Sequence, residues 1–147
     1  MVLAMMLAGA LGLQSGQQVV VQGGPPPKPV PKDAPKTLPD SPQGKHVQAY
    51  IDAYNSGDEA KFLKMQESLM SAEALSKRPP DQRAKMYARI RGDFPAMKIK
   101  RAAATAEQIR AIIEDRDGNE AIFSFDFEKT APFKIKGIAI DIGNIER

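Results

Sequence analysis

Residues 120–142 read EAIFSFDFEKTAPFKIKGIAIDI, and this stretch decides the fold class. Phe123, Phe125 and Phe127 alternate with polar residues. A period of two is typical of a β-strand with one buried face and one wet face. A second alternating run follows after a short polar connection, so the stretch predicts two neighbouring strands.

The closing strand changes parity at a glycine. Phe133 and Ile135 share one face, whereas the isoleucines from Ile138 onward alternate with the opposite parity. A β-bulge at Gly137 would bring both sets to the same side and would bend the strand. We therefore expect a strongly curved sheet.

Two further strands are predicted upstream of this pair. Met97 and Ile99 alternate with lysines, and residues 109–113 alternate in the same way. The pair Asp117-Gly118 then predicts a hairpin, because glycine accepts the positive φ that a tight turn demands. Residues 97–142 therefore predict a four-stranded antiparallel meander.

The residues before Pro95 have a helical period instead. Val47, Tyr50, Ile51 and Tyr54 are spaced i, i+3, i+4 and i+7, which is the apolar stripe of an amphipathic helix. A second helix is expected after Asp58, whose side chain suits the N-cap position.

Two more helices are predicted before the strands begin. Ser71 is placed to cap a short helical turn, and Pro80 suits the first position of another helix. The inner face of this last helix is expected to comprise Arg83, Met86, Tyr87 and Ile90. Helices followed by a meander predict an α+β domain in which N-terminal helices pack on the curved sheet.

The chain divides into three parts by composition. Residues 1–22 begin with the apolar run MVLAMMLAGALGL, which we interpret as a signal peptide or export segment, although no basic residue precedes Lys28. The run is too short for a stable membrane span. Residues 23–44 hold most of the prolines and predict a disordered, solvated linker. The α+β domain is expected over 45–147, and the protein is expected to be secreted or periplasmic.

Composition excludes several classes of function. The net charge is only +3 and no basic stripe is present, so we expect no nucleic-acid partner. The absence of cysteine removes disulfides and thiolate chemistry, and a single histidine excludes a histidine-rich metal site. No cofactor is implied.

The segment from His46 to Asp58, a helix that closes on an Asn-x-Gly-Asp turn, resembles the opening of NTF2-like (SnoaL-like) domains. The start at Pro80, the Asp-Gly turn and the strand around Gly137 are similar to the modules that precede secreted bacterial serine hydrolases and peptidases. The resemblance implies a cystatin-like cone with a pocket between helices and sheet. No Gly-x-Ser-x-Gly or Ser-x-x-Lys motif of a hydrolase is present.

Our first hypothesis is a non-catalytic binding or accessory domain that holds a small apolar ligand or peptide. The candidate ligand-binding residues are the aromatic side chains expected to face the cone: Tyr50, Tyr54, Tyr87, Phe123, Phe125 and Phe127. Plain core filling is the alternative for each of them. An open cavity between the first helix and the sheet would distinguish the two.

Two other hypotheses stay open. The resemblance implies that an isomerase or cyclase would need a base such as Asp52, Asp126 or His46 in the pocket, although a solvated role is the alternative for each. A protein–protein module would form a homodimer or dock on a separate hydrolase. In that case Ile112 and Ile122 would form a small apolar patch on the outer sheet face.

Overall fold

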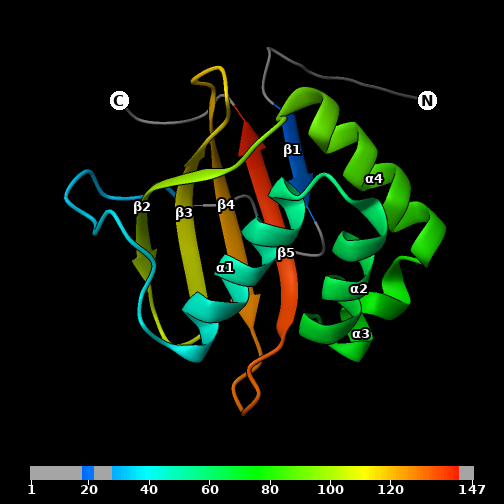
Figure 1. Ribbon diagram of the computed structural model, residues 1–147. Coiled ribbons are helices and arrows are strands. Elements are labelled where there is room, and N and C mark those ends of the chain that lie inside the picture. Colours follow the sequence, from blue (N-terminus) through cyan, green and yellow to red (C-terminus); the bar gives the residue numbers. More distant parts are fainter. Residues whose placement is uncertain (1–17, 22–27, 143–147) are drawn as a thin grey trace, which may run out of the picture.

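The computed structural model describes residues 18–21 and 28–142, with an α+β arrangement (Figure 1). The apolar run Met1–Leu13 lies outside these residues. Within them lie four helices, α1 (Pro42–Asn55), α2 (Glu59–Leu69), α3 (Ala72–Lys77) and α4 (Pro80–Asp93). The five strands are β1 (Gln18–Val21), β2 (Lys98–Ala104), β3 (Gln108–Glu114), β4 (Glu120–Phe127) and β5 (Ile135–Ile142).

The helices begin at the residues that the caps predict. The Asp58 side chain accepts a hydrogen bond from the Lys61 amide at the start of α2. The Ser71 hydroxyl accepts one from the Ala74 amide at the start of α3. Pro80 is the first residue of α4. Each cap satisfies a backbone N–H that the helix itself leaves unpaired, so these local predictions are confirmed.

The sheet contains the predicted meander and one additional strand. Its order is β1-β5-β4-β3-β2, and all neighbours are antiparallel. The additional strand comes from the segment 1–22, where we expected an export signal. β1 pairs with the edge of β5, with Val19 opposite Asp141, so the sheet extends into the residues assigned to that segment.

A bulge in β5 lies where the sequence predicts it. Asp126 pairs with Gly137, whereas the next residue, Phe127, pairs with Ile135, so Lys136 is the extra residue. As a result Ile135 and Ile138 are both buried in the same core. Phe133 differs from the prediction, because it lies in the loop before β5 and is half-buried.

The inner face of the sheet is covered by α1 (Figure 1). The predicted stripe of α1 is buried, with Val47 fully enclosed and Tyr54 only 1% exposed. It meets the phenylalanines of β4, and the Tyr50 and Phe125 rings contact edge to face at 5.4 Å. Rings packed in this geometry contribute beyond the area that they bury.

The outer face of the sheet is covered by part of the proline-rich segment. Val30 is 3% exposed and packs on Ile112 and Ile122, which face each other across β3 and β4. The Arg101 Nε donates to the Pro31 carbonyl at 3.0 Å, and the Arg110 guanidinium donates to the Pro29 carbonyl. The Ala102 amide also donates to the Pro35 carbonyl at 2.8 Å. Residues 29–35 therefore lie on the sheet, and the solvated linker predicted over 23–44 is corrected for this part.

The proline-rich segment also joins α1 without a gap. The α1 helix begins at Pro42, before the predicted domain boundary at residue 45, and Ser41 is its N-cap. A Cβ atom at Gly44 would lie 1.9 Å from the Pro39 carbonyl oxygen, so only glycine permits this close approach. The segment and the domain form one packed unit from residue 28 onward.

Candidate functional site

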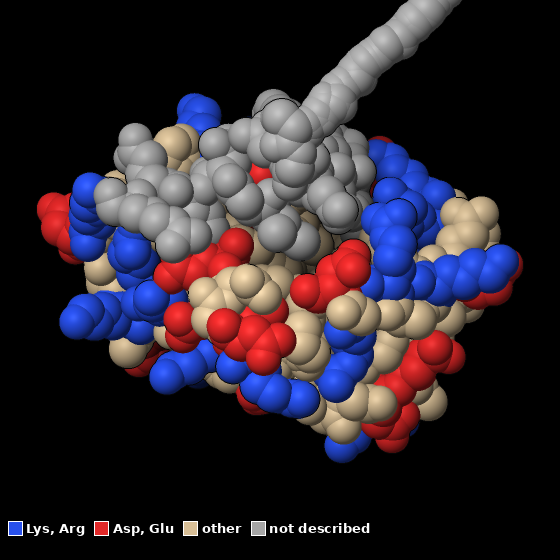
Figure 2. Space-filling view, turned by 90° about the horizontal axis from the view of Figure 1, so that it is seen from above, with Lys and Arg blue, Asp and Glu red and all other residues tan. Residues whose placement is uncertain are grey.

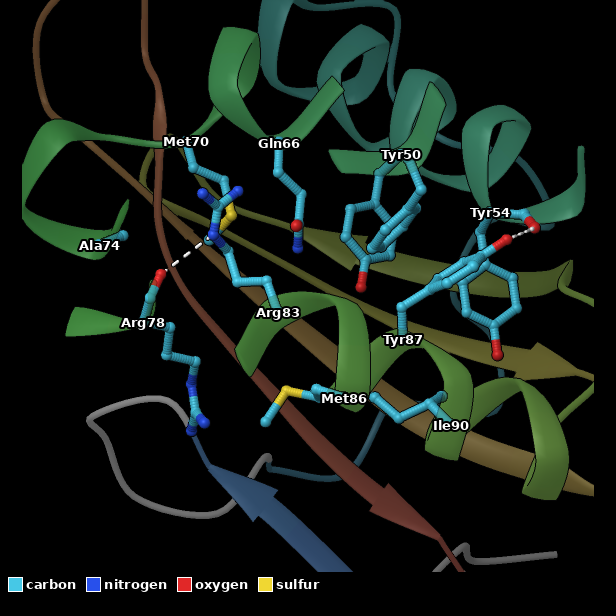
Figure 3. Close-up of a pocket in the computed structure, with 11 residues that line it drawn as sticks. Tyr50, Tyr54, Gln66, Met70, Ala74, Arg78, Arg83, Met86, Tyr87 and Ile90 are labelled. Carbon is cyan, nitrogen blue, oxygen red and sulfur yellow. Dashed lines mark hydrogen bonds between the residues drawn. The ribbon is translucent and has the colours of Figure 1, made fainter. Parts of the chain in front are cut away.

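A pocket lies among the helices rather than between α1 and the sheet (Figure 3). It is enclosed by side chains of α1, α2, α3, α4 and the connections between them. The described residues that line it are Tyr50, Tyr54, Phe62, Gln66, Met70, Ala74, Arg78, Arg83, Met86, Tyr87 and Ile90. Its free volume is about 20 Å³, which is space for roughly one or two water molecules.

The space beneath α1 is filled by aromatic rings. Phe123, Phe125 and Phe127 have no exposed surface. Phe123 and Phe125 also stack on each other, with their centroids 6.2 Å apart. None of the three lines the helical pocket. Phe123 and Phe125, which were predicted to contact a ligand, therefore lie outside this pocket, because alternate residues of β4 meet the apolar stripe of α1.

The three predicted tyrosines do come together at the pocket, but their hydroxyl groups differ. The Tyr54 hydroxyl donates to the Phe94 carbonyl at 2.6 Å, and the Tyr87 hydroxyl donates to the Tyr54 carbonyl at 3.4 Å. The Tyr50 hydroxyl has no hydrogen-bond partner among the described residues and points into the pocket (Figure 3). It is therefore the one tyrosine hydroxyl of this group that remains available.

Burial fixes the protonation state of these phenols. It raises the pKa of the Tyr50 hydroxyl well above its ordinary value, and it does the same for Tyr54. A phenol in this environment stays neutral throughout the physiological pH range. Tyr50 can therefore donate a hydrogen bond in the pocket, but it cannot act there as a phenolate base.

Two polar side chains that were not among the predicted ligand-binding residues complete the pocket. Gln66 is 6% exposed and Arg83 is 7% exposed. The Gln66 Oε1 and the Arg83 Nη1 are buried and have no hydrogen-bond partner among the described residues. The sequence did contain one indication of this site: Arg83, a charged residue, falls on the predicted apolar inner face of α4.

The remaining nitrogens of Arg83 are only partly satisfied. Its Nε donates to the Arg78 carbonyl at 3.0 Å (Figure 3). Its Nη2 lies 3.9 Å from a carboxylate oxygen of Glu67, whose side chain is 59% exposed. Such a long, exposed ion pair compensates little of the cost of removing a guanidinium from water.

The pocket is electropositive. Of the described residues that line it, Arg78 and Arg83 carry positive charge and none is acidic. Around them are aromatic and thioether side chains, which cannot replace water as hydrogen-bond partners. This arrangement favours a neutral or anionic group over a cation.

The residues considered for catalysis lie elsewhere. Asp52 is exposed and accepts a hydrogen bond from Gln48, and Asp126 accepts one from Gln108. His46 contacts the Pro132 carbonyl near the surface. None of the three lines the pocket. In the part of the chain that the structure describes, no group of three or more His, Asp or Glu side chains could hold a metal ion.

The surface that was predicted to bind a partner protein is covered in the folded structure. The expected apolar patch at Ile112 and Ile122 lies beneath Val30, so it is not exposed. Seen from above, basic and acidic side chains lie next to one another and neither sign covers this face (Figure 2). No helix among residues 28–142 has the length and hydrophobicity to cross a membrane.

Comparison of the chain with models of protein families gives no match, and comparison with curated proteins gives none either. The geometry of the helical pocket and the sequence therefore carry the functional argument by themselves.

Proposed function

We propose that this protein is an exported, non-catalytic binding domain whose ligand enters the pocket among the helices. One observation carries the proposal: the unpaired atoms of Gln66 and Arg83 are buried at the same aromatic pocket, beside the Tyr50 hydroxyl. Buried polar groups are nearly always hydrogen-bonded in folded proteins. A pocket with apolar walls and a few unpaired polar groups is a typical small-molecule site.

The sequence supports the remaining parts of the proposal. The apolar run at Met1–Leu13 supports export to a secreted or periplasmic location. The order of helices, hairpin and bulged strand supports an NTF2-like relationship, with a curved, cone-like sheet. The proposed site differs from the one that the resemblance implies, because side chains of the helices and their connections line it and none of the phenylalanines of β4 does.

The pocket admits only a small group unless its wall moves. Met70 and Met86 line it, and methionine side chains adapt their shape at low cost. The α3 helix also borders the pocket, and none of its six residues is buried. An element with so little buried surface opens at low free energy, so α3 is the expected entrance.

The proposal is tested by titrating the ¹⁵N-labelled protein with p-cresol, a small neutral aromatic probe, and recording amide chemical shifts. We expect the shifts to concentrate at Tyr50, Gln66 and Tyr87. The variant Ala74→Phe places a ring in the pocket and is expected to abolish binding. Ala72→Phe, on the exposed side of the same helix, is the matched control. Shifts that lie elsewhere, or that survive Ala74→Phe, would rule out this site.

A further inference from the structure

We infer that the pocket recognises a carboxylate with an adjacent N–H donor, the chemistry of a peptide C-terminus or an N-acylated amino acid. The inference rests on the proposed function and names its ligand class. It follows from which hydrogen-bonding capacity is unused at the pocket: a donor on Arg83, an acceptor on Gln66 and the hydroxyl of Tyr50.

The guanidinium of Arg83 selects for an anion. It is almost fully buried, one of its terminal nitrogens has no acceptor, and no acidic side chain lines the pocket. A buried charge is costly unless it is paired at close range. A carboxylate is the planar anion that a guanidinium binds best, through short charge-assisted hydrogen bonds.

The side-chain amide of Gln66 selects for a hydrogen-bond donor on the ligand. Its buried oxygen needs a donor, and a carboxylate alone has none. The C-terminal residue of a peptide carries an N–H one carbon away from its carboxylate, so one residue supplies both partners. The neutral Tyr50 hydroxyl is then available to donate to the second carboxylate oxygen.

The apolar walls of the pocket determine which side chain the ligand can carry. Phe62, Tyr87 and Ile90 surround the polar atoms with apolar surface, which suits an aliphatic side chain. A phosphate is disfavoured, because it brings up to two negative charges and three acceptor oxygens to a pocket in which only one guanidinium nitrogen is both buried and unpaired. A cation is disfavoured by both arginines.

Three matched compounds test the inference by NMR titration: N-acetyl-leucine, its primary amide, and 4-methylpentanoate, which keeps the carboxylate but lacks the N–H. We expect N-acetyl-leucine to bind about tenfold or more tightly than the amide and about threefold or more tightly than 4-methylpentanoate. Inorganic phosphate should compete weakly. Equal affinities, or stronger competition by phosphate, would overturn the inference.

Two variants assign the recognition to its residues. Arg83→Met should remove the preference for the carboxylate, and Gln66→Leu should remove the preference for the N–H. Arg89→Met, exposed on the same helix as Arg83, is the control and should change neither. Binding of p-cresol to each variant shows that the pocket still forms.

The p-cresol titration also separates the two proposals. If p-cresol binds and the three compounds do not differ, the carboxylate inference is wrong and the binding function stands. If neither p-cresol nor any of the compounds binds, both are wrong.

Discussion

The interior beneath α1 and the pocket among the helices use aromatic residues in opposite ways. Beneath α1, the three phenylalanines of β4 have no exposed surface, and none of them lines the pocket. In the pocket, Tyr50 and Tyr87 stand beside buried polar atoms that have no partner. The first region shows packing for stability, whereas the second keeps polar groups that stability alone would not favour.

A third buried polar group clarifies this difference. Asp115 is 6% exposed, and its carboxylate accepts hydrogen bonds from the amides of Asp117 and Asn119 and from the Asn119 side chain. It lies in the β3–β4 turn, where Gly118 has a φ of 86°. All of these hydrogen bonds to the carboxylate come from residues of the same turn. Among the described residues, two of the three buried polar side-chain atoms without a hydrogen-bond partner lie at the helical pocket, on Gln66 and Arg83. The third is Asp141 Oδ1, which belongs to β5 and does not line the pocket.

The largest effect is expected for Phe125→Ala. Truncation of a fully buried aromatic ring should lower the free energy of unfolding by about 3–5 kcal/mol, since a cavity replaces the ring. Urea denaturation measures the change. Phe133→Ala, at a half-buried loop residue, is the control and should cost clearly less. Equal losses at the two positions would contradict the distinction between the packed interior and the rest of the domain.

Asp115→Ala is expected to lower the free energy of unfolding by about 2 kcal/mol, because three hydrogen bonds to a carboxylate are lost. Burial raises the pKa of Asp115, but hydrogen bonds from Asn119, Asp117 and Gly118 outweigh it and hold the pKa below its ordinary value. A lowered pKa in the folded state contributes stability above the unfolded pKa, and this contribution is lost as the pH falls through the folded pKa.

The pH dependence gives Asp115 a second readout. The difference in unfolding free energy between wild type and Asp115→Asn should be constant at neutral pH and should shrink as the pH falls below about 4. Asp117→Asn, at the exposed neighbour in the same turn, is the matched control. A difference that persists unchanged to pH 2 would show that the charge of Asp115 does not stabilise the turn.

Val30→Ala should lower the free energy of unfolding by about 1.5 kcal/mol, because the substitution removes two buried methyl-sized groups. The reason is that Val30 seals Ile112 and Ile122 on the outer face of the sheet. Thermal or urea unfolding checks the value, with Lys32→Ala at an exposed residue of the same segment as control. If both substitutions are neutral, the proline-rich segment does not contribute to the folded unit.

The smallest effect on stability is expected for Gln66→Leu, whose free energy of unfolding should stay within about 1 kcal/mol of wild type or rise. Leucine is close to glutamine in size and removes a buried amide that lacks a partner. Gln82→Leu, exposed on α4, is the control. A loss of several kcal/mol at Gln66 would mean that its amide supports the fold, and the contrast between the two regions would then fail.

The sequence could predict those parts of the fold that depend on neighbouring residues. Asp58 and Ser71 cap their helices through the first turn that follows them. Gly118 meets the demand of its own turn, and the parity change around Gly137 required an extra residue in β5 whatever packs against it. The three tyrosines of the site were found because the apolar stripes of α1 and α4 must face inward.

Other features were decided only by tertiary structure. A proline-rich segment cannot pair its own backbone, so its place depends on distant donors, here Arg101 and Arg110, and on the apolar pair that Val30 covers. The position of the pocket likewise depends on how α2 meets α4. Gln66 and Arg83 have no relationship in sequence, and only the packing of these helices brings their unpaired atoms to one cavity.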